Sequence, residues 1–197
     1  MTHNEAQVAG LVLAAGAGRR LGGRPKALLV HRGRPLVEHA VTTLRAAGVA
    51  RVHVVLGAAA DAVREAARLD GCVLVENAGW AEGMGSSLRA GLESAAGTDA
   101  RAVLVSLVDQ PGIGPEAVRR VLGAYEGVDT LASAAYDGVR GHPVLFGAAH
   151  WAGIAESATG DQGARTYLKA HEVRFVECGD VAEAYDIDVA ADLGRLE

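Results

Sequence analysis

The chain has 197 residues, of which 50% are hydrophobic and only 4% aromatic, and its formal net charge is −5. This length suits one domain (residues 1–197) with a sizeable core, and the apolar fraction excludes an intrinsically disordered chain. The acidic net charge argues against nonspecific nucleic-acid binding, which depends on a broad basic surface.

Apolar runs of strand length alternate with amphipathic stretches of helical length. In chain order, strands are expected at Val8–Leu13, Arg51–Leu56, Cys72–Val75, Ala102–Val108, Thr130–Tyr136, Val139–Phe146 and Val173–Cys178. Helices are expected at Pro35–Ala47, Asp61–Arg68, Ser86–Ala96, Pro115–Tyr125 and Gly163–Ala170, and from Ala190 onward. Asp61 is the expected N-cap of the second helix.

This alternation predicts an α/β fold with a mostly parallel sheet that is covered by helices on both faces. Asp137-Gly138, between two of the strands, is the strongest hairpin signal in the chain. Because a hairpin joins antiparallel strands, we expect a mixed sheet.

The densest chemical signal is the loop after the first strand, LAAGAGRRLGGRPK (residues 13–26). It is not a P-loop, because Pro25 stands where glycine must precede the lysine, and Leu21 replaces the third glycine of a dinucleotide fingerprint. Its small residues would let backbone N–H groups approach phosphate oxygens, and Arg19 and Lys26 add positive charge. The alternative is a flexible glycine loop with solvated arginines. We interpret the loop as a phosphate-binding site.

Carboxylates form the second signal. Asp109 follows the strand with the most continuous apolar run, where it could bind Mg²⁺ together with phosphate oxygens or form a turn before Pro111. Asp186 and Asp188 flank Ile187, and at strand spacing both carboxylates would point to one face, which is costly without a cation between them. Asp188 could instead cap the terminal helix.

Several motifs occur in one order along nearly the whole chain. LAAGAGRRLGGRPKALL is followed by NAGWAEGMGSSLRAGL, LVDQP, RGHPVLF, GDQGAR and DIDVAADL. The series resembles the nucleotidyltransferase superfamily that activates sugar, alditol and pterin phosphates with NTPs, and within it the molybdenum cofactor cytidylyltransferases. The resemblance implies a three-layer, Rossmann-like fold of the nucleotide-diphospho-sugar transferase type. It also implies Mg²⁺-dependent transfer of CMP from CTP to the phosphate of molybdopterin cofactor, with release of pyrophosphate.

The resemblance also assigns roles to residues. Lys26, Arg19 and Asp109 are the implied catalytic residues, and Asp109 and Asp188 are the implied metal ligands, with Asp186 less certain. The implied nucleotide-binding residues are Leu13, Ala14, Ala15, Gly16, Gly18, Lys26, Asn77, Gly83, Gly85 and Ser87.

Two of these assignments compete with local structure. Ser87 would read the cytosine edge, with glycines allowing close approach of the base, but either Ser86 or Ser87 could cap the helix. His142 and Arg165 are the implied acceptor-binding residues, although a histidine beside a proline is often structural. Asp161 is expected to cap the helix that carries Arg165.

The nucleotide and the activity leave alternatives open. Similar guanylyltransferases typically carry glycine at the position of Ala15, which favours CTP over GTP here. A sugar- or alditol-phosphate cytidylyltransferase and a noncatalytic chaperone for the cofactor are the other hypotheses. Retention of Lys26, Asp109 and Asp188 argues for an enzyme, which would also contact a molybdoenzyme or its maturation factor transiently.

Three compartment signals agree with one another. No apolar run approaches the 18 or so residues of a membrane span, and the N-terminal MTHNEAQ lacks a signal-peptide pattern. Cys72 and Cys178 have no CxxC or histidine spacing, which argues against a disulfide framework or a zinc site. We therefore expect a cytoplasmic protein.

Overall fold

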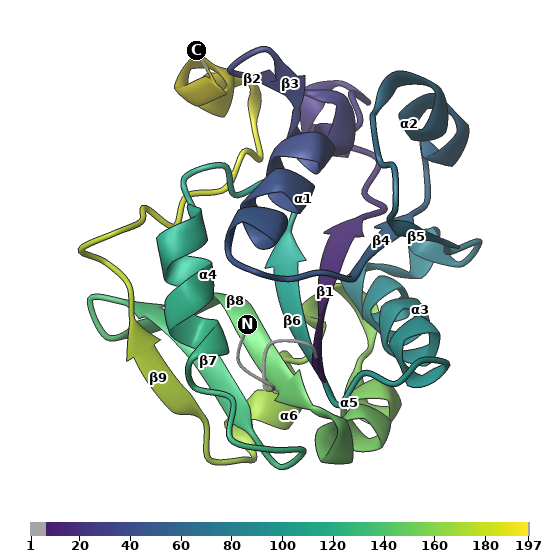
Figure 1. Cartoon of the computed structure of the whole chain (residues 1–197). Coiled ribbons are helices and arrows are strands. Elements are labelled where there is room, and N and C mark those ends of the chain that lie inside the picture. Colours follow the sequence, from purple (N-terminus) through teal and green to yellow (C-terminus); the bar gives the residue numbers. More distant parts are fainter. Residues whose placement is uncertain (1–6, 197) are drawn as a thin grey trace.

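The computed structural model describes residues 7–196, and its centre is a seven-stranded sheet of order β5-β4-β1-β6-β8-β7-β9 (Figure 1). Its strands are β1 (Val8–Ala14), β4 (Val52–Leu56), β5 (Val73–Glu76), β6 (Ala102–Leu107), β7 (Leu131–Tyr136), β8 (Val139–Gly147) and β9 (Arg174–Glu177). A separate small hairpin consists of β2 (Val30–His31) and β3 (Arg34–Pro35). Most of the N-terminal segment in which no targeting signal was expected lies outside the described residues.

The sheet is mixed, as predicted. Strands β5, β4, β1 and β6 run parallel to one another, whereas β8 is antiparallel to both β6 and β7. Asp137 and Gly138 join β7 to β8 with φ of 52° and 76°, the positive values that a type I′ hairpin turn requires. The last strand, β9, returns parallel to β7 at the edge of the sheet.

Helices cover both faces, which completes the predicted three layers (Figure 1). One face carries α1 (Leu36–Ala46), α2 (Ala60–Ala66) and α4 (Pro115–Leu122), and the other carries α3 (Met84–Ala96), α5 (Trp151–Ser157) and α6 (Arg165–Lys169). Side chains along β6 alternate between the two cores: Leu104 packs on the α1 side, and Val103 and Val105 pack on the α3 side. Helix α5 was not predicted, because its few apolar residues give only a short periodic signal.

The expected N-caps of two helices were wrong, whereas the last helix begins at Ala190, as predicted. Helix α2 begins at Ala60, so Asp61 lies inside the first turn, and α3 begins at Met84, ahead of both serines. The last helix is a 3-10 helix, Ala190–Leu196. The Asp192 carboxylate accepts hydrogen bonds from the N–H groups of Asp188 and Val189, just before this helix, while the Asp188 carboxylate accepts from Lys26.

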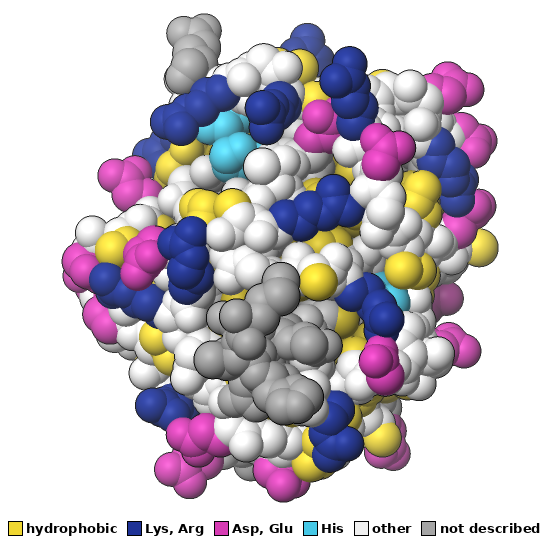
Figure 2. All heavy atoms as spheres, viewed as in Figure 1, with side chains coloured by type: hydrophobic (Ala, Val, Ile, Leu, Met, Phe, Trp, Pro, Cys, Tyr) yellow, Lys and Arg dark blue, Asp and Glu magenta, His cyan; other side chains and the backbone are white. Residues whose placement is uncertain are grey.

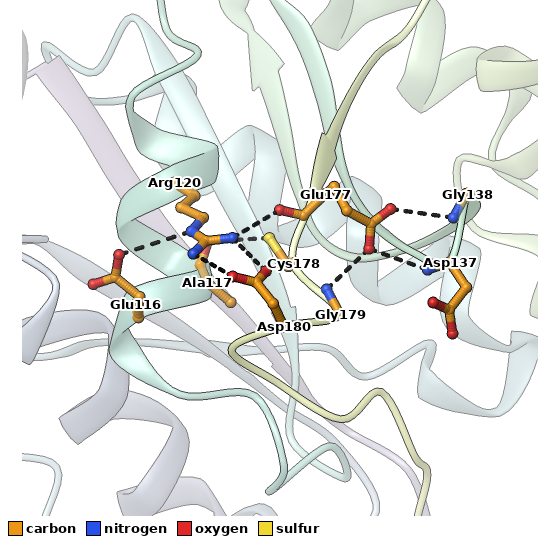
Figure 3. A network of polar contacts seen from close by, with 9 residues as sticks. All are labelled: Glu116, Ala117, Arg120, Asp137, Gly138, Glu177, Cys178, Gly179 and Asp180. Atoms are coloured by element: carbon orange, nitrogen blue, oxygen red, sulfur yellow. Dashed lines mark hydrogen bonds and ion pairs between the residues drawn. The ribbon is translucent and has the colours of Figure 1, made fainter.

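The Glu177 carboxylate ties β9 to the β7–β8 turn (Figure 3). It accepts hydrogen bonds from the N–H of Gly179 at 2.9 Å and from those of Gly138 and Asp137, each at 3.1 Å. These backbone donors favour the charged carboxylate and hold the pKa of Glu177 below its ordinary value of 4.5. Glu177 therefore stabilises the fold above pH 4.5, and this contribution disappears as the pH falls through the lower folded-state pKa.

Glu177→Gln is accordingly expected to lower the Tm at neutral pH, with a deficit that shrinks as the pH is lowered below 4.5. Thermal unfolding followed by circular dichroism over a pH series measures the deficit. Glu126→Gln is a suitable control, because it removes an exposed ion pair with Arg174 and should change the Tm little. A Glu177→Gln deficit of the same size at every pH would contradict this account.

Arg120 of α4 fixes the segment that follows β9 (Figure 3). Its guanidinium bonds both carboxylate oxygens of Asp180, at 2.6 and 2.8 Å, and the backbone carbonyl of Glu177 at 3.1 Å. The chain continues from this anchor to Asp186-Ile187-Asp188. The anchor therefore fixes the start of the segment that leads from β9 to that motif.

The surface and the helices add two observations. None of the helices in the described part of the chain is long and apolar enough to cross a membrane.

On the face drawn in Figure 2, which carries α1 and α4, basic and acidic side chains are interspersed.

Candidate active site

Lys26 is the centre of the candidate site. It begins the 3-10 helix Lys26–Leu28, which follows the loop after β1. Its Nζ donates to Asp109 Oδ2 at 2.5 Å and to Asp188 Oδ1. Since β1 and β6 are adjacent and parallel, their carboxyl ends place Lys26 and Asp109 at one edge of the sheet.

Lys26 is only 18% exposed and Asp109 16% exposed, whereas Asp188 is 42% exposed. Burial lowers the pKa of Lys26, but the two carboxylates outweigh burial and raise it above its ordinary value. Burial raises the pKa of Asp109, and the charge of Lys26 opposes this shift only in part. The site therefore holds a permanent ammonium between two carboxylates.

The Asp186-Ile187-Asp188 segment reaches the site through its backbone. The N–H of Ile187 donates to the carbonyl of Asp109 at 2.9 Å, and the Ile187 side chain is fully buried. Asp186 turns away from Lys26 and accepts a hydrogen bond from Gln110 Nε2 at 2.7 Å. The expectation that both carboxylates share one face was wrong, because this segment is not part of a strand.

A cavity of about 470 Å³ opens beside Lys26. Of the predicted residues, those that line it are Leu13, Ala15, Gly16, Gly18, Arg19, Lys26, Gly83, Ser87, Asp109 and Asp188. Gly18 has a φ of +61°, and a Cβ there would lie 1.7 Å from the carbonyl oxygen of Arg24. Gly18 thus closes the loop on itself, while exposed Gly16 leaves open space at the cavity wall. We call this cavity the nucleotide cavity.

Three predicted nucleotide-binding residues are not among the residues lining this cavity. Ala14 is buried at the end of β1. Gly85 packs against the backbone of Ala158, where an added Cβ would lie 2.8 Å from the carbonyl carbon. Asn77 is buried, and its side chain organises the loop instead of facing the cavity.

The two serines, either of which was expected to be able to cap the helix, have different roles. Asn77 Nδ2 donates to Ser86 Oγ at 2.9 Å and to Ser87 Oγ at 3.1 Å. Ser86 Oγ is within 2.9 Å of the carbonyls of Gly79 and Gly83, so its proton is used inside the loop. Ser87 lines the nucleotide cavity and keeps its proton for a ligand.

A second cavity, of about 560 Å³, adjoins the first on the side of β8. It contains both predicted acceptor residues, His142 and Arg165, together with Asp186. Burial lowers the pKa of His142 to about 4, with a smaller effect from Arg140. His142 is therefore neutral at neutral pH and offers hydrogen bonding, while Arg140 and Arg165 provide positive charge. We call this cavity the acceptor cavity.

Asp109 and Asp188 fit a divalent cation. One ammonium already contacts both carboxylates, so a single cation can do the same. Mg²⁺ typically takes one or two carboxylates and completes its shell with phosphates and water. Across residues 7–196 there is no cluster of three or more His, Cys, Asp or Glu side chains that could hold a metal.

The structure adds residues that sequence reasoning missed. Met84 and Asp161 line both cavities. Asp161 was expected only to cap a helix, but it lies in the 3-10 helix Gly160–Gln162, and α6 has no side-chain cap. Trp80 also lines the nucleotide cavity, and its Cβ lies against Gly57, where an added Cβ would be 2.6 Å away.

Comparisons with known proteins agree with this geometry. The model of the MobA-like NTP transferase domain matches residues 10–175. The nicotine blue oxidoreductase of Paenarthrobacter nicotinovorans is 41% identical over 198 residues, covering 96% of each chain. The molybdenum cofactor guanylyltransferase of Acidiphilium cryptum is 38% identical over 58% of this chain and 56% of its own.

A solved structure has the same architecture. The complex of Rv0371c with manganese, from Mycobacterium tuberculosis H37Rv, superimposes with a TM-score of 0.74 at 30% identity. The alignment covers 96% of this chain and 97% of that one. The predicted nucleotide-diphospho-sugar transferase type of fold is thereby confirmed.

Proposed function

Because the chain belongs to the family of MobA-like NTP transferase domains, and is thus a nucleotidyltransferase, we propose that it transfers CMP from CTP to the phosphate of molybdopterin cofactor, with release of pyrophosphate. The observation that carries the proposal is the position of Lys26. Its ammonium lies between two carboxylates at the wall of one cavity, and a second cavity adjoins that cavity. Such a cleft suits two phosphate-bearing substrates that must react with each other.

The chain's own residues would act mainly on charge and position. The phosphate monoester of the acceptor is largely dianionic near neutral pH, so the attack needs no protein base. The obstacle is repulsion between this anion and the triphosphate. Lys26 and Arg19, both on the nucleotide cavity, would neutralise the triphosphate and hold it for in-line attack.

Mg²⁺ is the divalent cation in this proposal, held by Asp109 and Asp188, and it would supply charge neutralisation at the phosphate oxygens. Lys26 bonds the same two carboxylates, so its ammonium must release at least part of that contact when the cation binds. Released Lys26 would then be free to donate to phosphate. Manganese in the complex of the mycobacterial relative supports a divalent cation in this family.

The acceptor cavity supports a substrate with an anionic group and an aromatic body. Arg140 and Arg165 provide charge, while Tyr136, Phe146 and Leu168 provide apolar surface. The free thiols of Cys72 and Cys178 fit the cytoplasmic location that we propose. Delivery to a molybdoenzyme or its maturation factor remains part of the proposal.

The proposal is tested by measuring Mg²⁺-dependent pyrophosphate release with CTP, GTP, ATP and UTP, each with and without molybdopterin cofactor. Release with CTP only, and only with the cofactor, supports it. Release with GTP would identify a guanylyltransferase, and release with a sugar or alditol phosphate would identify another cytidylyltransferase. Binding of nucleotide or cofactor without release would indicate a chaperone.

Ser87→Ala is expected to raise the KM for CTP roughly 5- to 10-fold, because it removes one hydrogen bond to the base. Steady-state kinetics at saturating acceptor measures the change. Ser157→Ala is the matched control, since the Ser157 hydroxyl donates to Gly153 within α5 and lies outside both cavities. An unchanged KM for CTP in Ser87→Ala would remove this serine from base recognition.

A second candidate reaction for the cleft is a redox one. It is favoured by one observation, the 41% identity with nicotine blue oxidoreductase over 96% of both chains. The same protein should therefore be assayed with NADH or NADPH and nicotine blue. Dye reduction without pyrophosphate release from any NTP would assign this function in place of CMP transfer.

A further inference from the structure

The nucleotide and acceptor cavities share one wall. Four residues line both cavities: Leu13 and Leu107, near the ends of β1 and β6, and Met84 and Asp161. These last two residues belong to segments that are distant in the chain, 82–85 and 158–161. We call the two segments together the partition.

The two segments of the partition touch through their backbones. A Cβ on Gly83 would lie 2.6 Å from both Asp161 Oδ1 and the carbonyl carbon of Gly160. A Cβ on Gly85 would lie 2.8 Å from the carbonyl carbon of Ala158. Any side chain at either glycine would push the segments apart. These two glycines therefore allow the backbones of the two segments to approach each other closely.

Arg89 clamps the two segments. It lies in α3, slightly more than one turn beyond the partition, and its guanidinium donates in two directions. Nη2 donates to Glu82 Oε2 at 2.9 Å, and Nη1 donates to the carbonyl oxygen of Ala158. Ala158 is the C-cap of α5, where a carbonyl lacks a partner within the helix. One side chain thus bridges the 82–85 segment and the end of α5.

The clamp has little to do with overall stability. The side chains of Arg89 and Glu82 are 38% and 66% exposed, and exposed ion pairs contribute little to the free energy of unfolding. A planar guanidinium fixes geometry well, however, because its two donors have set directions. Both fixed segments border the region where the two substrates must meet.

We propose that Arg89 is a positioning residue that holds the partition and thereby aligns the acceptor phosphate with the nucleotide. The proposal rests on the function proposed above. It predicts that loss of the clamp acts on kcat more than on nucleotide binding, because Lys26, Ser87 and Asp109 keep their own contacts. A misplacement of about 1 Å between reacting groups can cost on the order of 100-fold in rate.

Arg89→Ala is expected to lower kcat about 10- to 100-fold and to leave the KM for CTP within about 3-fold. Arg89→Lys should not restore the rate, because one ammonium cannot reproduce the two directed donors. Arg119→Ala is a closely matched control: Arg119 also bridges a glutamate, Glu116, and a helix carbonyl, that of Ala46. It lies outside both cavities, so its kcat should stay at the wild-type value.

Hydrogen exchange of the ligand-free proteins gives a readout that does not depend on transfer. Amides of residues 82–85 and 158–163 should exchange faster in Arg89→Ala than in wild type, and should be unchanged in Arg119→Ala. Unchanged exchange, or a kcat within 2-fold of wild type, would overturn the proposal. If Arg89→Ala and Arg119→Ala lost kcat to the same extent and also showed the same fall in Tm, that result would overturn the proposal too. If wild-type protein releases no pyrophosphate from any NTP, the proposed function fails, and the exchange result alone decides whether Arg89 holds the partition.

Discussion

Lys26→Ala is expected to lower the rate of pyrophosphate release by ~10²–10³, the typical effect of removing one preorganised charged contact from a transition state. Its ammonium is the buried cation of the site and is held by Asp109 and Asp188. Without it, two carboxylates would face an incoming triphosphate, and the basic side chains left on the lining of the nucleotide cavity would be the exposed Arg19 and Arg20. Pyrophosphate release at saturating CTP and acceptor measures the loss.

The chain provides an unusually clean control for this experiment. Lys169 is the only other lysine in the sequence, and it lies exposed at the end of α6. Lys169→Ala should retain wild-type turnover, and circular dichroism should show that Lys26→Ala is folded. Near-normal release by folded Lys26→Ala would exclude the charge-neutralisation mechanism.

The parts of the site that follow directly from strand ends could be predicted from sequence. An apolar run ending on Asp109, and a glycine-rich loop ending on Lys26, specify their own places, because parallel neighbours bring their carboxyl ends to one edge of a sheet. The opposing helical faces and the Asp137-Gly138 turn are local patterns of the same kind. These local patterns were sufficient to predict the mixed sheet.

What could not be predicted depends on contacts between distant segments. From the sequence, Gly85 is expected to let a nucleotide base approach closely. Only the packing of residue 158 shows that Gly85 instead lets another backbone segment approach. Asp186 and Asp188 look equivalent until Ile187 is bonded to the backbone of Asp109, which turns the carboxylates toward different cavities. Nothing in the local sequence fixes either arrangement.

This division of the two carboxylates leads to the second large expected effect. Asp109→Asn should lower pyrophosphate release by ~10²–10³, because it removes the better-buried of the two carboxylates that contact Lys26. Asp188→Asn should chiefly raise the Mg²⁺ concentration needed for half-maximal rate, since Asp188 is more exposed and shares its charge with Arg20 at 4.0 Å.

Asp186→Asn is the matched comparison for both variants. Its carboxylate bonds Gln110 and lines the acceptor cavity, away from Lys26. It should leave the Mg²⁺ dependence at the wild-type value and raise only the KM for the acceptor. A shift in the Mg²⁺ requirement of Asp186→Asn as large as that of Asp188→Asn would place both carboxylates on the cation. Asp186 could reach the space between Asp109 and Asp188 only if the backbone at Ile187 moved. Lys26, which bonds both of those carboxylates, would then have to leave that space completely when the cation binds.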